Sequence, residues 1–363
     1  MNPSVTKIKV KKASAKNANG YDEGNSYAWE DIEYDDDPWV FNASRPYFVT
    51  AGLQNRHLSL WASHGRYWDA ERGWKWQRPN LFCTNEDLFT QTIVVPYLIP
   101  MLQKEEVIVD NNDRKSISYI EVDNSKKWKD CDSLGFANAK DVYSDGENPF
   151  RMGTARQVKA TKKKKKYSLV SYQPKIKEAG KYAVYVSYQT LPKSVPDVKY
   201  IVYHKGQATE FTVNQRMGGG TWVYLGTFDF DEGCNQQNRV VCTNLASKRG
   251  VVTTDAVRFG GGMGNIERGG NVSGLPRCLE GARYYAQWAG APYKIYGGRK
   301  GQNDYADDIN TRSLMTNWLG GGSVYMPAAN GKNVPIELSL ALHSDAGYNP
   351  DGKSTWGALA ICT

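Results

Sequence analysis

Three residues far apart in the sequence, His64, Glu86 and His343, have the chemistry of a catalytic zinc site. The chain has four histidines, and these two each follow a short apolar segment, 57–62 and 335–342, that is typical of a buried strand. The carboxyl ends of parallel strands meet at one edge of a sheet, so the two imidazoles could share a crevice. Two histidines and one carboxylate leave a fourth zinc position open for water. The pattern predicts a Zn²⁺ site.

Each of these residues also has an ordinary structural explanation. A histidine after a strand is often a capped or solvated loop residue. Glu86 falls in the first turn of a helix predicted to begin at Thr84 or Asn85, where a negative charge favours the helix dipole. The pattern alone therefore leaves metal binding and a structural role open.

The elements that would position these residues follow from the periodicity of apolar side chains. The helix that starts at Thr84 or Asn85 should kink or end at Pro96 and Pro100. A strand is predicted at 293–296 and a second helix at 304–319. Between these regions, β-branched and aromatic residues punctuated by glycines predict short strands of a sandwich or barrel, at 181–188, 198–203, 221–230, 239–243 and 251–259.

This pattern predicts an α/β core, with a mixed sheet flanked by helices, interrupted by an all-β sandwich domain. The predicted parts are an irregular N-terminal segment (1–45), the first part of the core (46–117), the inserted sandwich (118–265) and the second part of the core (266–363).

Composition narrows the class of protein. The chain of 363 residues is 40% hydrophobic and 12% aromatic, which is typical of a globular protein, and its formal net charge is +8. Lysines gather at 7–16 and 162–166, but no motif that reads nucleic acid accompanies them. We expect no membrane span, and no signal peptide follows Met1.

The cysteines suggest one disulfide bond. Cys234 and Cys242 could pair across a hairpin.

Several motifs together resemble one family. The segments 60–68 (LWASHGRYW), 74–79 (WKWQRP), 86–102 and 340–347 (LALHSDAG) are similar to the amidase-3 class of N-acetylmuramoyl-L-alanine amidases. They resemble a Bacteroidetes branch, often labelled xanthan lyase-like, that carries an inserted golvesin/Xly carbohydrate-binding-like domain. The segments that resemble this insert include 148–150 (NPF), 219–222 (GGTW), 224–228 (YLGTF) and 255–261 (DAVRFGG).

The resemblance implies that His64, Glu86 and His343 hold Zn²⁺ and that the substrate is peptidoglycan. The implied reaction hydrolyses the amide bond between the lactyl group of muramic acid and L-alanine. Zinc would polarise the carbonyl and lower the pKa of its bound water. The family is exported, so the resemblance also implies a periplasmic or extracellular location.

The sequence departs from the family in two places. The family's general-base glutamate follows the second histidine motif in a later strand, so it is expected beyond Thr363 and the catalytic residue stays unassigned. Glu280 and Asp345 are acidic residues that could replace it, but neither matches the motif. After Gln103, a strand with an Arg-rich segment that the family usually has is missing.

Two other functions compete with the amidase. The chain could be a carbohydrate-binding or cell-wall-binding protein with a vestigial metal site, in which Trp222 and Tyr224 stack on sugar rings. Aromatic residues in strands more often pack in the protein core than bind sugars, and Trp222 and Tyr224 could each have this structural role instead. A polysaccharide lyase would need a tyrosine or histidine base beside a group that neutralises a uronate, and the sequence shows no such combination.

Overall fold

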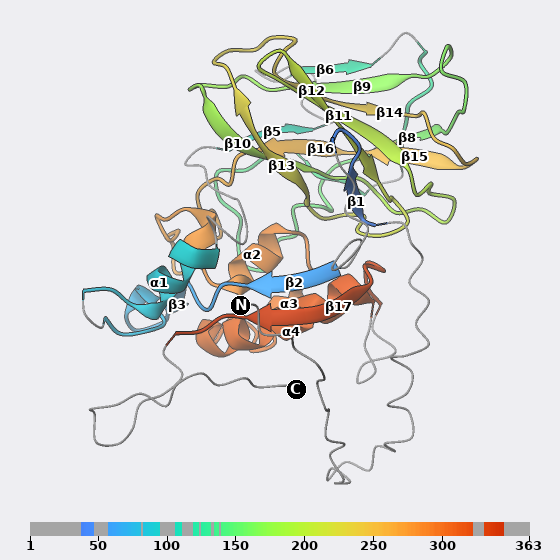
Figure 1. Ribbon diagram of the computed structural model, residues 1–363. Coiled ribbons are helices and arrows are strands. Elements are labelled where there is room, and N and C mark those ends of the chain that lie inside the picture. The colour runs from blue at the N-terminus through green and yellow to red at the C-terminus, as the bar shows by residue number, and fades with distance from the viewer. Residues whose placement is uncertain are drawn as a thin grey trace, which may run out of the picture. The chain divides into compact units, whose positions relative to one another are not determined.

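The computed structural model describes most of the chain between residues 38 and 344. The described ranges are 38–46, 57–80, 83–94, 106–110, 119–122, 125–131, 134–137, 139–321 and 330–344. Within them, strands are the dominant regular structure, and most of the strands pair in antiparallel sheets (Figure 1).

The largest sheet has six strands in the order β1-β12-β11-β14-β9-β6. Their bounds are β1 (Val40–Asn42), β12 (Gln207–Val213), β11 (Val198–His204), β14 (Arg239–Thr243), β9 (Leu169–Gln173) and β6 (Tyr119–Val122). A four-stranded sheet has the order β13 (Val223–Phe230), β10 (Gly180–Val186), β16 (Ala256–Phe259) and β5 (Val107–Asp110). A three-stranded sheet consists of β15 (Val251–Thr254), β8 (Arg156–Lys159) and β7 (Lys129–Asp130).

The sandwich core lies between the six-stranded and four-stranded sheets. Alternate residues of β11, Val198, Tyr200 and Val202, are fully buried and belong to the same apolar cluster as Val184 and Val186 of β10. This alternation is what a strand with one core face requires. The sandwich predicted from the glycine-punctuated strands is therefore present.

Strand β10 is buried on both of its faces. Val184 and Val186 contribute to the sandwich core, whereas Ala183 and Tyr185 belong to a second cluster that contains Trp288. A strand covered on both sides has a continuous apolar sequence instead of an alternating one. This explains why the segment 182–186 (YAVYV) contains no charged residue.

The remaining elements are short strands and helices. Strands β2 (His57–Trp61) and β17 (Ile336–Ala341) pair in parallel, and β3 (Arg66–Asp69) pairs with β4 (Gly73–Trp76) in a hairpin. The helices are α1 (Glu86–Ile93), α2 (Ala282–Trp288), α3 (Tyr293–Tyr296) and α4 (Asp304–Gly320), with a 3₁₀ turn at Arg277–Leu279. Helix α4 is capped at its C-terminus by Gly321, whose φ of 82° is the left-handed conformation that glycine adopts without strain.

The prediction of an α/β core with a mixed sheet flanked by helices is wrong. Among the described residues, the only parallel strands are the pair β2 and β17, and the chain is predominantly a β-sandwich. Residues 107–110, which fall in the segment 46–117 assigned to the core, form strand β5 and extend the four-stranded sheet by pairing with β16. The segment 293–296, expected to be a strand, is helix α3, which begins after Pro292. Three residues of the segment expected to be irregular, 40–42, form strand β1.

Two simpler expectations concern disulfides and membranes. Cys234 is an exposed free thiol and Cys242 is a buried one, so the suggested hairpin disulfide is absent. In the described part of the chain, every helix is too short or too polar to cross a membrane.

Candidate functional site

The structure brings His64, Glu86 and His343 together. One potential ligand atom from each lies within 4.8 Å of the others. His343 Nδ1 is 2.9 Å from Glu86 Oε1, and His64 Nε2 is 3.5 Å from Glu86 Oε2. The centroids of the two imidazole rings are 4.7 Å apart. The cluster therefore offers two nitrogens and a carboxylate to one point in space.

The parallel pairing of β2 and β17 positions the two histidines. In this register Trp61 lies opposite Ala341, and the Leu342 amide donates to the Trp61 carbonyl at 3.2 Å. His64 and His343 follow within three residues of these positions, at the same carboxyl edge of the pair. The two apolar segments identified in the sequence are therefore direct neighbours (Figure 1).

Helix α1 supplies the carboxylate at its first residue. Asn85 is the N-cap, and its side chain accepts a hydrogen bond from the Leu88 amide at 2.9 Å. The Gln91 side chain donates to the His64 carbonyl at 3.3 Å, which ties the helix to the histidine loop. Glu86 is therefore held at the helix N-terminus, where its negative charge is favourable.

The glycine after His64 is required by close packing. A Cβ atom at Gly65 would lie 2.3 Å from the backbone carbonyl carbon of Glu280. Any other residue would push the 277–280 turn away from the loop that carries His64. The S-H-G sequence thus combines a candidate metal ligand with a position that only glycine fits.

The electrostatic surroundings of His64 favour its neutral form. Burial lowers the pKa of His64 below its ordinary value, and the hydrogen bond with Glu86 only partly offsets this effect. Metals bind the neutral imidazole. His64 Nε2 is buried and lies 3.5 Å from Glu86 Oε2. A buried ring nitrogen beside a carboxylate fits a zinc ligand.

Two arginines border the cluster. Arg78 Nε is 3.3 Å from Glu86 Oε2, and Arg312 Nη2 is 3.2 Å from His64 Nδ1. The Ser344 amide donates to Glu86 Oε1 at 3.0 Å. Arg312 also pairs with Asp308 at 3.1 Å, so its charge is partly balanced. Arg78 and the Ser344 amide orient the carboxylate, as hydrogen-bonded neighbours of metal ligands do. Arg312 can only donate, so His64 Nδ1 is the acceptor in their contact.

Of the two acidic residues considered as a general base, only Glu280 lies among the described residues. Asp345 lies outside the described residues. Glu280 is not part of the three-residue group whose ligand atoms converge. Its carboxylate lies in a buried position where a Cβ atom at Gly264 would be 2.0 Å from Oε1. Burial raises the pKa of Glu280 from 4.5 to about 7.

This raised pKa predicts a dependence of stability on pH. Between pH 4.5 and about 7 the folded protein holds a proton on Glu280 that the unfolded chain has lost. Stability should therefore fall as pH rises through this window, by about 3 kcal/mol in total. Glu280→Gln should remove most of this loss, whereas exposed Glu232→Gln should not. Urea unfolding at pH 5, 6, 7 and 8 measures the difference, and parallel pH profiles for all three proteins would contradict the assignment.

The two aromatic residues predicted to stack on sugars occupy different environments. Trp222 is 6% exposed, and its ring stacks on Trp288 with centroids 5.5 Å apart. It offers no open face to a sugar and packs as a core residue. Tyr224 is partly buried, and its hydroxyl lies 2.9 Å from that of Thr227.

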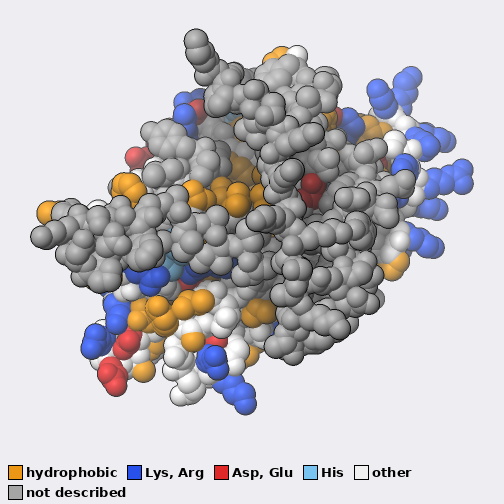
Figure 2. Space-filling view, turned by 60° about the horizontal axis from the view of Figure 1, so that its bottom comes forward, with side chains coloured by type: hydrophobic (Ala, Val, Ile, Leu, Met, Phe, Trp, Pro, Cys, Tyr) orange, Lys and Arg blue, Asp and Glu red, His pale blue; other side chains and the backbone are white. Residues whose placement is uncertain are grey.

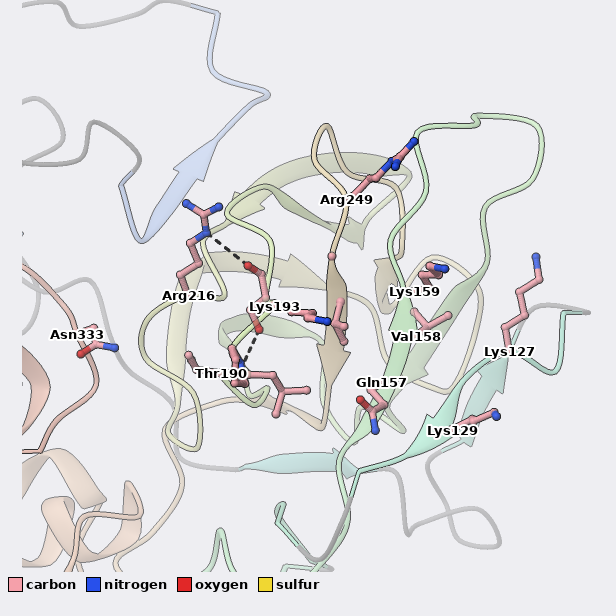
Figure 3. Close-up of a pocket in the computed structure, with 15 residues that line it drawn as sticks. Lys127, Lys129, Gln157, Val158, Lys159, Thr190, Lys193, Arg216, Arg249 and Asn333 are labelled. Carbon is pink, nitrogen blue, oxygen red and sulfur yellow. Dashed lines mark hydrogen bonds between the residues drawn. The ribbon is translucent and has the colours of Figure 1, made fainter.

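The sequence analysis missed a basic pocket beside the three-stranded sheet (Figure 3). Its volume is about 1110 Å³, and its described lining includes six basic residues, Lys127, Lys129, Lys159, Lys193, Arg216 and Arg249. These residues come from five separate segments of the chain. None of them belongs to the conspicuous lysine run at 162–166, so no local signal in the sequence identifies them together.

Comparison with known proteins gives one domain assignment. Residues 143–261 match the family model of the Golvesin C-terminal domain, which is about a third of the chain. A segment of 90 residues is 33% identical to xanthan lyase from Bacillus sp. (strain GL1). That segment is 25% of this chain and only 10% of the enzyme. The golvesin and xanthan lyase-like part of the resemblance is thereby confirmed, and its amidase part stays a prediction.

Two solved structures of polysaccharide-acting enzymes show weak similarity. A Paenibacillus xanthan lyase is 24% identical, with 43% of this chain and 13% of the enzyme covered and a TM-score of 0.32. An isomalto-dextranase from Arthrobacter globiformis with bound panose is 16% identical, with 39% and 23% covered and a TM-score of 0.22. Neither score establishes a shared fold for the whole chain. The assignment that stands is narrower: residues 143–261 are a golvesin-like domain.

Proposed function

We propose that this chain binds a glycan at the bacterial cell surface through its golvesin-like β-sandwich. The observation that carries the proposal is the match of residues 143–261 to the Golvesin C-terminal domain. The segment that is 33% identical to a xanthan lyase supports it, because that enzyme is named for a polysaccharide. The expected partner is peptidoglycan or another cell-wall glycan, and the expected location is periplasmic or extracellular.

Co-sedimentation with insoluble glycans tests this proposal. The purified chain should pellet with cell-wall sacculi or with an insoluble polysaccharide and should be released by the matching soluble glycan. His343→Ala should pellet equally well, because His343 lies outside the golvesin-like domain. Failure of the folded chain to bind any neutral or acidic glycan would refute the proposal.

A second candidate function is amide hydrolysis in peptidoglycan. The convergence of His64, Glu86 and His343 within 4.8 Å favours it, because this donor set fits a catalytic zinc ion. When bound, zinc would supply an activated water and polarise the substrate carbonyl. The chain's own contribution is orientation: Arg78 and the Ser344 amide hold the Glu86 carboxylate, and Arg312 contacts the imidazole of His64.

Muropeptide cleavage separates the two candidates. For an amidase, the zinc-loaded chain should release peptides with a free L-alanine amine from purified sacculi, detected by mass spectrometry. His64→Ala should abolish this release while glycan binding persists. Zinc binding without any cleavage would leave the glycan-binding function with a metal site that does not catalyse.

A further inference from the structure

The basic pocket carries an inference that rests on the proposed glycan-binding function and extends it. We propose that this pocket binds the anionic groups of an acidic glycan, carboxylate or phosphate, and so sets the preference of the golvesin-like domain. The pocket lies apart from the histidine cluster: none of its described lining residues is His64, Glu86 or His343.

All charged residues in the described lining of the pocket are positively charged. Six of its fifteen described lining residues are lysine or arginine, and none is acidic. All six side chains are exposed, so their charges are available to a ligand in water. The acidic residue next to Lys129 in the chain, Asp130, pairs with Arg156 at 3.8 Å and is not part of the lining. Clustered charge of one sign raises the local concentration of an oppositely charged ligand.

The three-stranded sheet forms one wall of the pocket. Lys129 of β7 lies opposite Gln157 of β8, and Lys159 of β8 lies opposite Val251 of β15. Opposite residues, and residues two apart on one strand, point to the same face of a sheet. These side chains therefore share one face, and the sheet fixes the spacing between the two lysines.

A turn at 191–194 forms another wall and is held rigidly. The Leu191 amide donates to the Ser194 hydroxyl at 2.9 Å, and the Ser194 amide donates back to the Leu191 carbonyl at 2.9 Å (Figure 3). The Val251 amide donates to the Lys193 carbonyl at 2.8 Å, which ties the turn to β15. Arg216 Nε reaches the Ser194 carbonyl at 3.4 Å. This wall of the pocket is therefore in place before a ligand arrives, which reduces the entropy lost on binding.

The size and polar lining favour a saccharide. A volume of about 1110 Å³ exceeds what a single small anion needs and lies slightly above the range of about 300–1,000 Å³ that is typical of small-molecule sites. Thr190, Gln157 and Asn333 add hydroxyl and amide groups that can bond to sugar hydroxyls. The described lining contains no aromatic side chain. The pocket therefore offers charge and hydrogen bonds to a ligand, and not the aromatic stacking by which single-stranded nucleic acid is usually held.

Basic side chains are also abundant elsewhere on the surface. The test must therefore distinguish glycan binding in the pocket from non-specific attraction to the positive charge of the whole surface. In the view of Figure 2, Lys and Arg side chains of the described residues gather along one side of the molecule. The run 162–166 is fully exposed and lies outside the pocket lining. It provides a matched control, because removing two of its lysines changes the net charge by the same amount.

The experiment compares the full-length chain with two double variants. Lys193→Ala/Arg249→Ala removes charge from the pocket, and Lys163→Ala/Lys165→Ala removes it from the run. Binding is measured by calorimetry with a soluble polyuronate, a poly(glycerol phosphate), neutral dextran and duplex DNA. The pocket variant should bind the acidic glycan roughly tenfold more weakly, since two charged donors are lost, and the control variant should match the wild type. The polyuronate and phosphate arms identify which anionic group is preferred.

Three results would overturn the inference. The pocket variant could bind the acidic glycan as tightly as the wild type, or both variants could lose affinity equally, which indicates diffuse charge. DNA could bind as tightly as the glycan with the same response to the pocket variant, which indicates an unselective polyanion site. In any of these three cases, dextran binding that neither variant affects would leave the proposed function standing. If no glycan binds at all, the proposed function fails as well.

Discussion

Replacing His343 by alanine should weaken Zn²⁺ binding by more than about 100-fold. Loss of a neighbour that merely orients a metal ligand typically costs 10–100-fold, so loss of one of only three protein ligands should cost more. His343 Nδ1 lies 2.9 Å from Glu86 Oε1, so the imidazole is close to the proposed metal position. Competition with a chromophoric zinc chelator measures the affinity, and elemental analysis measures the zinc content of the purified protein.

The matched control for this prediction is His204→Ala. His204 belongs to strand β11 of the sandwich, and its Nε2 lies 3.0 Å from the Thr209 hydroxyl. It is not part of the converging group, so its loss should leave zinc affinity unchanged. Equal zinc affinity in His343→Ala and the wild type would rule out the proposed centre. Equal losses in His343→Ala and His204→Ala would indicate unspecific histidine binding.

The convergence of His64, Glu86 and His343 could be predicted because the residues next to each of them in the sequence indicate the local structure. Each histidine follows an apolar strand, and parallel pairing of β2 with β17 brings both to one edge. The position of Glu86 could be predicted because Asn85 is the N-cap, so that Glu86 is the first residue of helix α1. The sequence could not predict which side chains surround the three candidate ligands. The contacts of Arg78 and Arg312 with the cluster depend on tertiary packing and have no signature in the residue pattern.

The fold was harder to predict because an apolar strand does not specify its partner. The residues of β5 form an ordinary short apolar strand, and they were assigned to the core on the basis of their place in the chain. Pairing with β16 buries them equally well. Residues 293–296 combine two tyrosines and an isoleucine, which favours a strand locally, but packing of Ile295 and Tyr296 with Trp318 accompanies a helix. Tertiary packing overrides local propensity at such positions.

The charges buried beneath the sandwich were also beyond sequence reasoning, and they have a large expected effect on stability. Arg283 is completely buried, and its guanidinium lies 2.8 Å from Asp304 and 3.0 Å from Asp145. Its Nε also donates to the Tyr296 carbonyl at 3.2 Å. The group is therefore satisfied on several sides by partners from three segments of the chain. Removing one partner of a buried ion pair leaves uncompensated charge and costs about 3–5 kcal/mol.

Arg283→Ala should lower the free energy of unfolding by about that amount, because it opens a cavity and leaves Asp304 and Asp145 with Arg268 as their remaining cationic partner. Arg283→Lys should recover only part of the loss, since an ammonium group cannot reproduce the two-pronged contact with Asp304 and Asp145. Exposed Arg299→Ala should change stability by less than about 0.5 kcal/mol. Urea unfolding followed by tryptophan fluorescence measures all three. If Arg283→Ala and Arg299→Ala had the same free energy of unfolding, the ion pairs of Arg283 would not contribute to stability. The segments that they join would then be held together by the apolar cluster around Trp288.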